Sequence, residues 1–120
     1  MEHTSSRVIC LCIEGTRAEF EKRLDDARAL YWQAWEAARD DYEACVAAHY
    51  VARFQDNSEE KLRWNQLALN HANAIQDDSV KAFYPSLYLN MGQSYELLGD
   101  QVEAQRYYDL AESFGVLHEK

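Results

Sequence analysis

Apolar side chains recur at steps of three and four residues along most of this chain, and residues that interrupt helices are nearly absent. Phe20, Leu24, Ala27 and Tyr31 begin one such stripe. This spacing places apolar side chains on one face of an α-helix. The chain has one Pro and four Gly among 120 residues, whereas a β-sandwich needs many more turn residues. The sequence therefore predicts an all-α fold.

Five helices are predicted from where these stripes begin and end. Thr16 with Glu19 three residues later forms a capping box, which is a typical signal for a helix start. Pro85 lacks the backbone N–H that a helix interior needs, so the fourth helix should begin near Tyr84, with 79–83 as a turn or a kinked extension. The expected helices span about 17–39, 41–54, 59–76, 84–98 and 101–114. Because the breaks are short, consecutive helices should pack as antiparallel hairpins.

The residues before Thr16 form a separate segment in this interpretation. The expected divisions are a leader at 1–15, a helical domain at 16–117 and a tail at 118–120. An apolar run at 8–13 is far too short to span a bilayer and lacks the positive flank of a signal peptide. We therefore expect the leader to be a flexible segment, a short strand-like arm or a segment added for expression.

The formal net charge of −9 limits the classes of partner. Nucleic acids and anionic membranes bind clusters of Lys and Arg, and the sequence has no such cluster. A neutral or basic partner suits an acidic protein better. The three cysteines, Cys10, Cys12 and Cys45, are few and follow no secretory pattern, which points to a reducing cytoplasm. We therefore expect a cytoplasmic protein that binds neither nucleic acid nor membrane.

A stretch near the C-terminus, 85–117, carries a specific pattern of large and small residues. Its first helix has Tyr88, then the pair Met91-Gly92, then Tyr95. Its second helix has a small, an aromatic and a small residue at steps of four and three: Ala104, Tyr108 and Ala111. The turn between them is Leu98-Gly99-Asp100, and Val116 stands where the pattern usually ends in proline. This stretch resembles a tetratricopeptide repeat, in which small residues let two helices approach and aromatic rings fill the space beside them.

Weaker copies of the same pattern precede it. An offset of 44 residues aligns Ala48 with Gly92 and Trp64 with Tyr108. The first predicted helix repeats the small–aromatic–small spacing with Ala27, Tyr31 and Ala34, so it resembles the second half of an earlier repeat. The resemblance therefore implies about two and a half repeats, stacked as a short right-handed superhelix.

The resemblance also implies a function, because tetratricopeptide repeats usually bind peptides in a concave groove lined by the first helix of each hairpin. By register, the helices at 41–54 and 84–98 would line the groove here. Its expected residues are Tyr42, Cys45, His49, Ala52, Arg53, Ser86, Leu89, Asn90, Gln93 and Glu96. Some members hold a C-terminal carboxylate with several basic residues. Asn90 stands at a position used for such a clamp, and Arg53 lies nearby in the groove by register. The other basic residues of the clamp are missing, so a clamp for a chaperone tail is not expected. The chain is expected to be a scaffold for a protein or peptide.

No motif for catalysis or metal binding stands out. Zinc needs four ligands at recognisable spacing, and Cys10-x-Cys12 has no second pair. His49 follows Cys45 by one helical turn, but no third group is evident that would orient a Cys–His pair. The sequence therefore predicts no enzyme, no cofactor and no metal.

An alternative to peptide binding comes from the last predicted helix. Stacked repeats need a polar cap, and no further amphipathic helix follows. An apolar face would then remain exposed, formed by Tyr107, Leu110, Phe114 and Leu117. This alternative predicts a homo-oligomer, or a partner helix, at that face.

Overall fold

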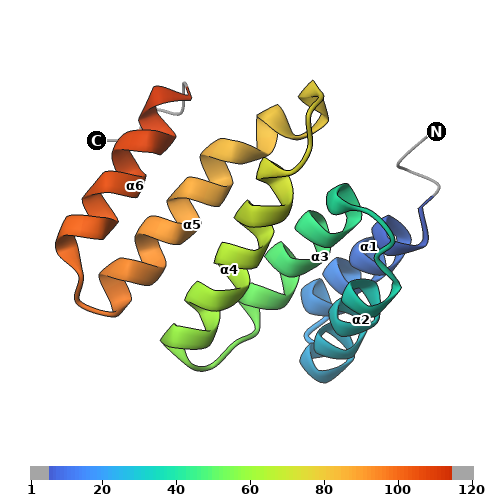
Figure 1. The fold of residues 1–120 in the computed structure, drawn as a ribbon. Helices are drawn as coiled ribbons and strands as arrows, with labels where there is room; N and C mark the ends of the chain where they lie inside the picture. The colour runs from blue at the N-terminus through green and yellow to red at the C-terminus, as the bar shows by residue number, and fades with distance from the viewer. Residues whose placement is uncertain (1–5, 115–120) are drawn as a thin grey trace.

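The computed structural model describes residues 6–114, and this part of the chain is a row of helices without strands. The elements are α1 (Arg7–Phe20), α2 (Leu24–Ala37), α3 (Asp41–Arg53), α4 (Ser58–Asn73), the 3₁₀ helix η2 (Asp78–Phe83), α5 (Tyr84–Leu97) and α6 (Gln101–Ser113). Figure 1 shows them side by side, from α1 and α2 at one end to α6 at the other. The predicted all-α class is confirmed, and the predicted count of five helices is one too few for the described residues.

Consecutive helices pack in pairs. α1 packs along α2, α3 along α4 and α5 along α6. Contacts of α2 with α3, and of α4 with α5, join the three hairpins into one row. The predicted arrangement of adjacent helix pairs is therefore confirmed, with a complete hairpin at the N-terminal end.

This first hairpin corrects the predicted leader. α1 begins at Arg7, and the Ser6 hydroxyl caps it by accepting the backbone N–H of Ile9. Thr16 does not start a helix, because it lies inside α1 and its hydroxyl donates to the Cys12 carbonyl. One side of the apolar run faces the core, where Val8, Leu11 and Cys12 are buried. Residues 7–15 are thus part of the folded domain, and 1–5 lie outside the described residues.

The predicted helix at 17–39 is wrong because the chain turns at Lys22. Lys22 has a φ of 68°, in the left-handed region where a helix commonly ends. The backbone N–H of Arg23 then donates to the Ala18 carbonyl at 2.8 Å, which is the closing bond of a Schellman motif. Gly99 ends α5 in the same way with a φ of 86°. The two turns are equivalent, although only one of them has glycine.

The first and last hairpins also share a close contact between their helices. A Cβ added to Gly15 would lie 2.5 Å from Cε1 of Tyr31, and one added to Gly92 would lie 2.6 Å from Cε1 of Tyr108. Both tyrosine hydroxyls donate to matching glutamates, Glu19 and Glu96. Gly15 therefore marks a helix contact and not a domain boundary.

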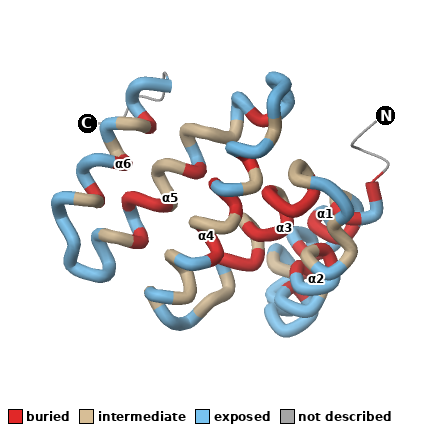
Figure 2. Tube along the Cα trace, viewed as in Figure 1, coloured by how far each residue is buried: buried red, intermediate tan, exposed pale blue. Residues whose placement is uncertain are grey.

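The second hairpin forms the centre of the core. Figure 2 shows buried residues gathered along α3, whereas α2 and α6 are mostly exposed. Many buried residues of α3 are small: Ala44, Cys45, Ala47, Ala48 and Ala52. Trp64 of α4 is buried, and the rings of Trp32 and Trp35 pack edge-on against it, with centroids 5.7 and 5.0 Å away. Small residues on α3 thus let the neighbouring helices approach while large rings fill the gaps.

The other predicted boundaries agree with the structure within a few residues. α3 is capped by Asp40, whose carboxylate accepts the backbone N–H of Glu43. The turn expected at 79–83 is the 3₁₀ helix η2, and Pro85 stands in the first turn of α5. The tail at 118–120 lies outside the described residues.

Candidate functional site

Two hollows follow one another between α3 and α5, and together they are named here the α3–α5 channel. The first hollow, about 180 Å³, is lined by Cys45, Val46, His49, Tyr50, Phe83, Ser86 and Leu87. The second, about 130 Å³, is lined by Ala52, Arg53, Lys61, Asn65, Asn90, Gln93, Ser94 and Leu97. Because each helix contributes successive turns to both, the channel runs along α3 and α5.

The first hollow is mainly apolar. Cys45 and Leu87 are buried in it, and the Phe83 ring packs against Tyr42 with centroids 5.7 Å apart. Ser86 is exposed and supplies a hydroxyl at the edge. This hollow has the chemistry to take an apolar side chain.

The second hollow is polar and carries two basic side chains. The Asn65 amide donates to the Ser94 hydroxyl at 3.0 Å. Arg53 forms an ion pair with Glu19 of α1, whereas Lys61 forms no ion pair with any residue that the structure describes. The chain has 21 acidic and 12 basic residues, so a hollow with two basic side chains is unusual for it. Together, the carboxamide and cationic groups of this hollow favour a ligand group that accepts hydrogen bonds or carries a negative charge.

A hydrogen bond joins α3 to α5 between one lining residue of each hollow. The Asn90 amide nitrogen lies 3.2 Å from Nδ1 of His49. Burial, with a smaller contribution from the charge of Arg53, lowers the pKa of His49. The imidazole is therefore neutral at pH 7, and Nδ1 can accept the amide hydrogen.

The structure brings most of the predicted groove residues to this channel. Cys45, His49 and Ser86 line the first hollow, and Ala52, Arg53, Asn90 and Gln93 line the second. Three predicted residues lie outside the hollows. Tyr42 packs behind Phe83, Leu89 is half-buried, and Glu96 accepts the Tyr108 hydroxyl on the side of α5 that faces α6.

Sequence reasoning missed α1 as a helix of its own, because residues 1–15 were assigned to a leader and Glu19 and Phe20 to the start of a helix at 17–39. α1 packs against α3, and its Glu19 holds Arg53 at the channel. Ile13 and Phe20 of α1 are 53% and 87% exposed, so α1 presents apolar side chains to solvent. An offset of 33 residues, which aligns Gly15 with Ala48 and Tyr31 with Trp64, would have identified this helix.

The residues expected to form an apolar face at the last helix differ in their exposure. Tyr107 is buried and stacks on Tyr95 with centroids 5.7 Å apart. Leu110 is half-buried, and Phe114 is 42% exposed although its ring stacks on Tyr84 with centroids 5.3 Å apart. The exposed residues of α6 are largely polar and bond one another, as Gln105 with Asp109 and Arg106 with Glu103. The exposed side of α6 is thus mainly polar, with Val102 and Phe114 as exposed apolar residues near its two ends. Leu117 lies outside the described residues.

The buried thiols have no chemistry that suggests catalysis. Burial raises the pKa of Cys45 to about 11 and that of Cys12 to about 12. A thiol must lose its proton to act as a nucleophile, so both are inert at pH 7. No cluster of His, Cys, Asp or Glu among the described residues could hold a metal ion.

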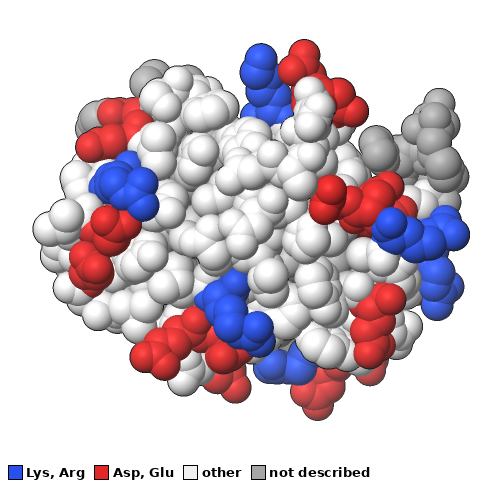
Figure 3. Space-filling model, viewed as in Figure 1, with Lys and Arg blue, Asp and Glu red and all other residues white. Residues whose placement is uncertain are grey.

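Charge is unevenly spread over the surface. In the view of Figure 3, the middle of the molecule, over α4 and α5, carries few charged side chains, and Lys, Arg, Asp and Glu gather around its edge.

None of the helices in the described part of the chain has the length and apolar character needed to cross a bilayer. Comparisons of the chain with protein-family models, with curated proteins and with solved structures each gave no match.

Proposed function

We propose that this chain is a tetratricopeptide-type scaffold that binds a segment of another protein along the α3–α5 channel. The observation that carries the proposal is the channel itself, with an apolar hollow and a polar hollow on successive turns of α3 and α5. It includes residues that the family resemblance assigns to a peptide groove. The repeated Gly–Tyr contact of the first and last hairpins supports three stacked repeats and a right-handed superhelix.

The two hollows define the chemistry of the bound segment. An apolar side chain fills the hollow over Cys45, and a carboxylate or carboxamide meets Asn90, Gln93 and Lys61 in the other. The centres of the hollows are about two helical turns apart, roughly 10 Å. An extended peptide covers that distance in about three residues. The preferred ligand therefore has an apolar residue and an acidic or amide residue about three positions apart.

This proposal is tested with a displayed library of random peptides and two matched substitutions. Gln93→Trp fills the polar hollow from an exposed position on α5, and Gln33→Trp adds the same ring at an exposed position on α2 outside the channel. Peptides selected on the unmodified chain should lose binding at least tenfold to Gln93→Trp and keep it with Gln33→Trp. Selected peptides that bind both variants as well as the unmodified chain would contradict channel binding, and so would a library that yields no binding peptide.

A homo-oligomer through α6 has no comparable support. Of the residues expected at that face, Tyr107 is buried, Leu110 is half-buried, and Phe114 is exposed while its ring stacks on Tyr84 of α5. The proposal includes a cytoplasmic location. It assigns no catalytic role to Cys45, the thiol in the channel, because burial raises its pKa and keeps it protonated at pH 7.

A further inference from the structure

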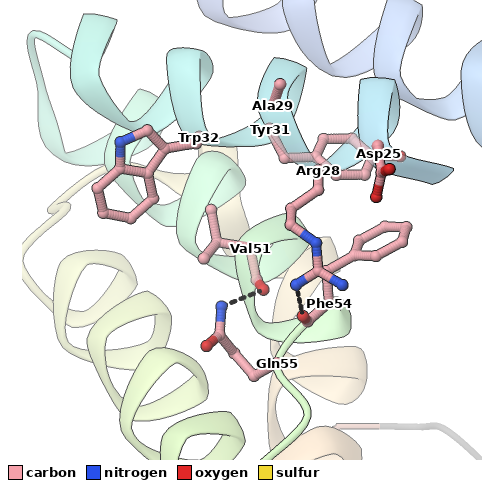
Figure 4. A pocket seen from close by; sticks show the side chains of 8 residues that line it. All are labelled: Asp25, Arg28, Ala29, Tyr31, Trp32, Val51, Phe54 and Gln55. Atoms are coloured by element: carbon pink, nitrogen blue, oxygen red, sulfur yellow. Dashed lines mark hydrogen bonds between the residues drawn. The ribbon is translucent and has the colours of Figure 1, made fainter.

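A hollow larger than either part of the α3–α5 channel lies on the other side of α3, between α2 and α3. It measures about 390 Å³, and its lining residues are Asp25, Arg28, Ala29, Tyr31, Trp32, Val51, Phe54 and Gln55. This volume is in the range of small-molecule sites. Figure 4 shows the side chains of α2 above it and those of the end of α3 below.

One wall of this hollow is apolar and fixed in place. Trp32 is 45% exposed, yet its ring is held edge-on against the buried Trp64, with centroids 5.7 Å apart. Val51 is buried, and the small side chain of Ala29 leaves room beside the indole. A flat apolar group entering here would cover indole surface that otherwise faces water.

The other wall presents a guanidinium. Arg28 lies over the Phe54 ring, 5.6 Å from its centroid, and one of its N–H groups donates to the Phe54 carbonyl. These contacts hold the group in position while leaving other N–H donors available. Arg28 forms no ion pair with any described residue. In Figure 4, Asp25 lies on the Phe54 side of Arg28, and Trp32 and Val51 lie on the opposite side. An anion in the hollow therefore meets the guanidinium before it meets the carboxylate.

A carboxamide completes the edge between the two walls. The Gln55 amide nitrogen donates to the Val51 carbonyl at 3.2 Å, which orients the side chain and leaves its second N–H as a donor. The hollow thus combines an indole face, an oriented cation and an amide donor. We propose that it binds a small carboxylic acid with a flat apolar body, with the body against Trp32 and the carboxylate on Arg28.

The test uses 3-phenylpropanoate and its cationic counterpart 3-phenylpropylamine as probes of the intact chain. The chain has three Trp residues, and the indole N–H signal of Trp32 is assigned in a ¹⁵N spectrum with a Trp32→Phe variant. We expect the acid to shift this signal saturably with a Kd on the order of 1 mM. The amine should bind at least about fivefold more weakly, because it faces a like charge.

Two variants and a control decide the outcome. Arg28→Gln should weaken binding of the acid about tenfold and leave binding of the amine unchanged or stronger. Arg106→Gln, which removes a guanidinium 4.5 Å above the Tyr107 ring at the far end of the row, should change neither. Ala29→Phe fills the hollow without removing any bond and should abolish binding of both probes, so the site remains testable if Arg28→Gln fails to fold. Equal affinity for acid and amine, unchanged acid binding in Arg28→Gln, or no saturable shift would each overturn the proposal.

Discussion

Replacing Gly15 with alanine should destabilise the protein, although the same change inside an ordinary helix stabilises it. Gly15 lies in α1 against the Tyr31 ring, and an added Cβ would be 2.5, 2.8 and 2.9 Å from three ring carbons. Tyr31 cannot easily retreat, because it is 1% exposed and stacks on Tyr50 with centroids 4.8 Å apart. Its hydroxyl is also held by Thr16 at 3.1 Å.

The magnitude follows from two opposing effects. Alanine gains about 1 kcal/mol over glycine in a helix. Forcing an extra methyl group into a packed site costs about 1–3 kcal/mol, and the upper part of that range applies because ring atoms block the methyl group on a fixed side. The free energy of unfolding should therefore fall by about 1–2 kcal/mol. Gly92→Ala meets a similar clash with Tyr108, but that ring is only half-buried, so its net effect should be smaller.

Urea unfolding followed by far-UV circular dichroism measures both changes. The control is Gly15→Ala in a Tyr31→Leu background, where the methyl group has room and the helix-propensity gain of about 1 kcal/mol should reappear. If Gly15→Ala alone raised the free energy of unfolding by that amount, the close contact between α1 and α2 would not exist as described.

Three further outcomes follow from single side chains. Lys22→Gly should raise the free energy of unfolding by about 1 kcal/mol in a urea titration, because it relieves a side chain from a left-handed backbone; an unchanged midpoint would argue against the turn between α1 and α2. With a thiol reagent at pH 7, exposed Cys10 should react at once and buried Cys12 and Cys45 only after unfolding, and rapid reaction of all thiols would contradict the packing of α1 and α3. The lowered pKa of His49 means that the unfolded chain takes up a proton more readily than the folded chain. The stability that neutral His49 contributes to the folded chain is complete above about pH 6.5, the pKa of an unfolded histidine. It is lost as the pH falls through the lower pKa of His49 in the folded chain. His49→Gln should therefore reduce the loss of stability on acidification from pH 7 to pH 5, and an equally steep loss in this variant would refute the assignment.

The sequence predicted best where local chemistry and packing agree. The last hairpin has a glycine at the left-handed turn and an aspartate after it, so its helices could be placed within a few residues. Pro85 likewise fixed the start of α5, because proline tolerates only the first turn of a helix. At these positions the local signal alone determines the backbone.

The N-terminal hairpin was misread because its signals conflict. The turn at Lys22 has no glycine, so the apolar stripe appeared to continue from α1 into α2. Gly15 looked like a boundary, although its small size serves the contact with Tyr31. Tyr107 was assigned to an exposed partner face for a related reason: its stack on Tyr95 depends on how α5 and α6 pack, which helical periodicity does not specify. Burial between elements is a tertiary property, and a single helix pattern leaves it open.

Peptide binding along the α3–α5 channel is tested most directly by mapping amide chemical shifts with a peptide selected on the intact chain. The account predicts that the largest changes fall on α3 between Cys45 and Arg53 and on α5 between Ser86 and Gln93, including the side-chain amide of Asn90. The changes should disappear in Gln93→Trp. Changes centred on the exposed faces of α2 or α6, with α3 and α5 unaffected, would contradict it.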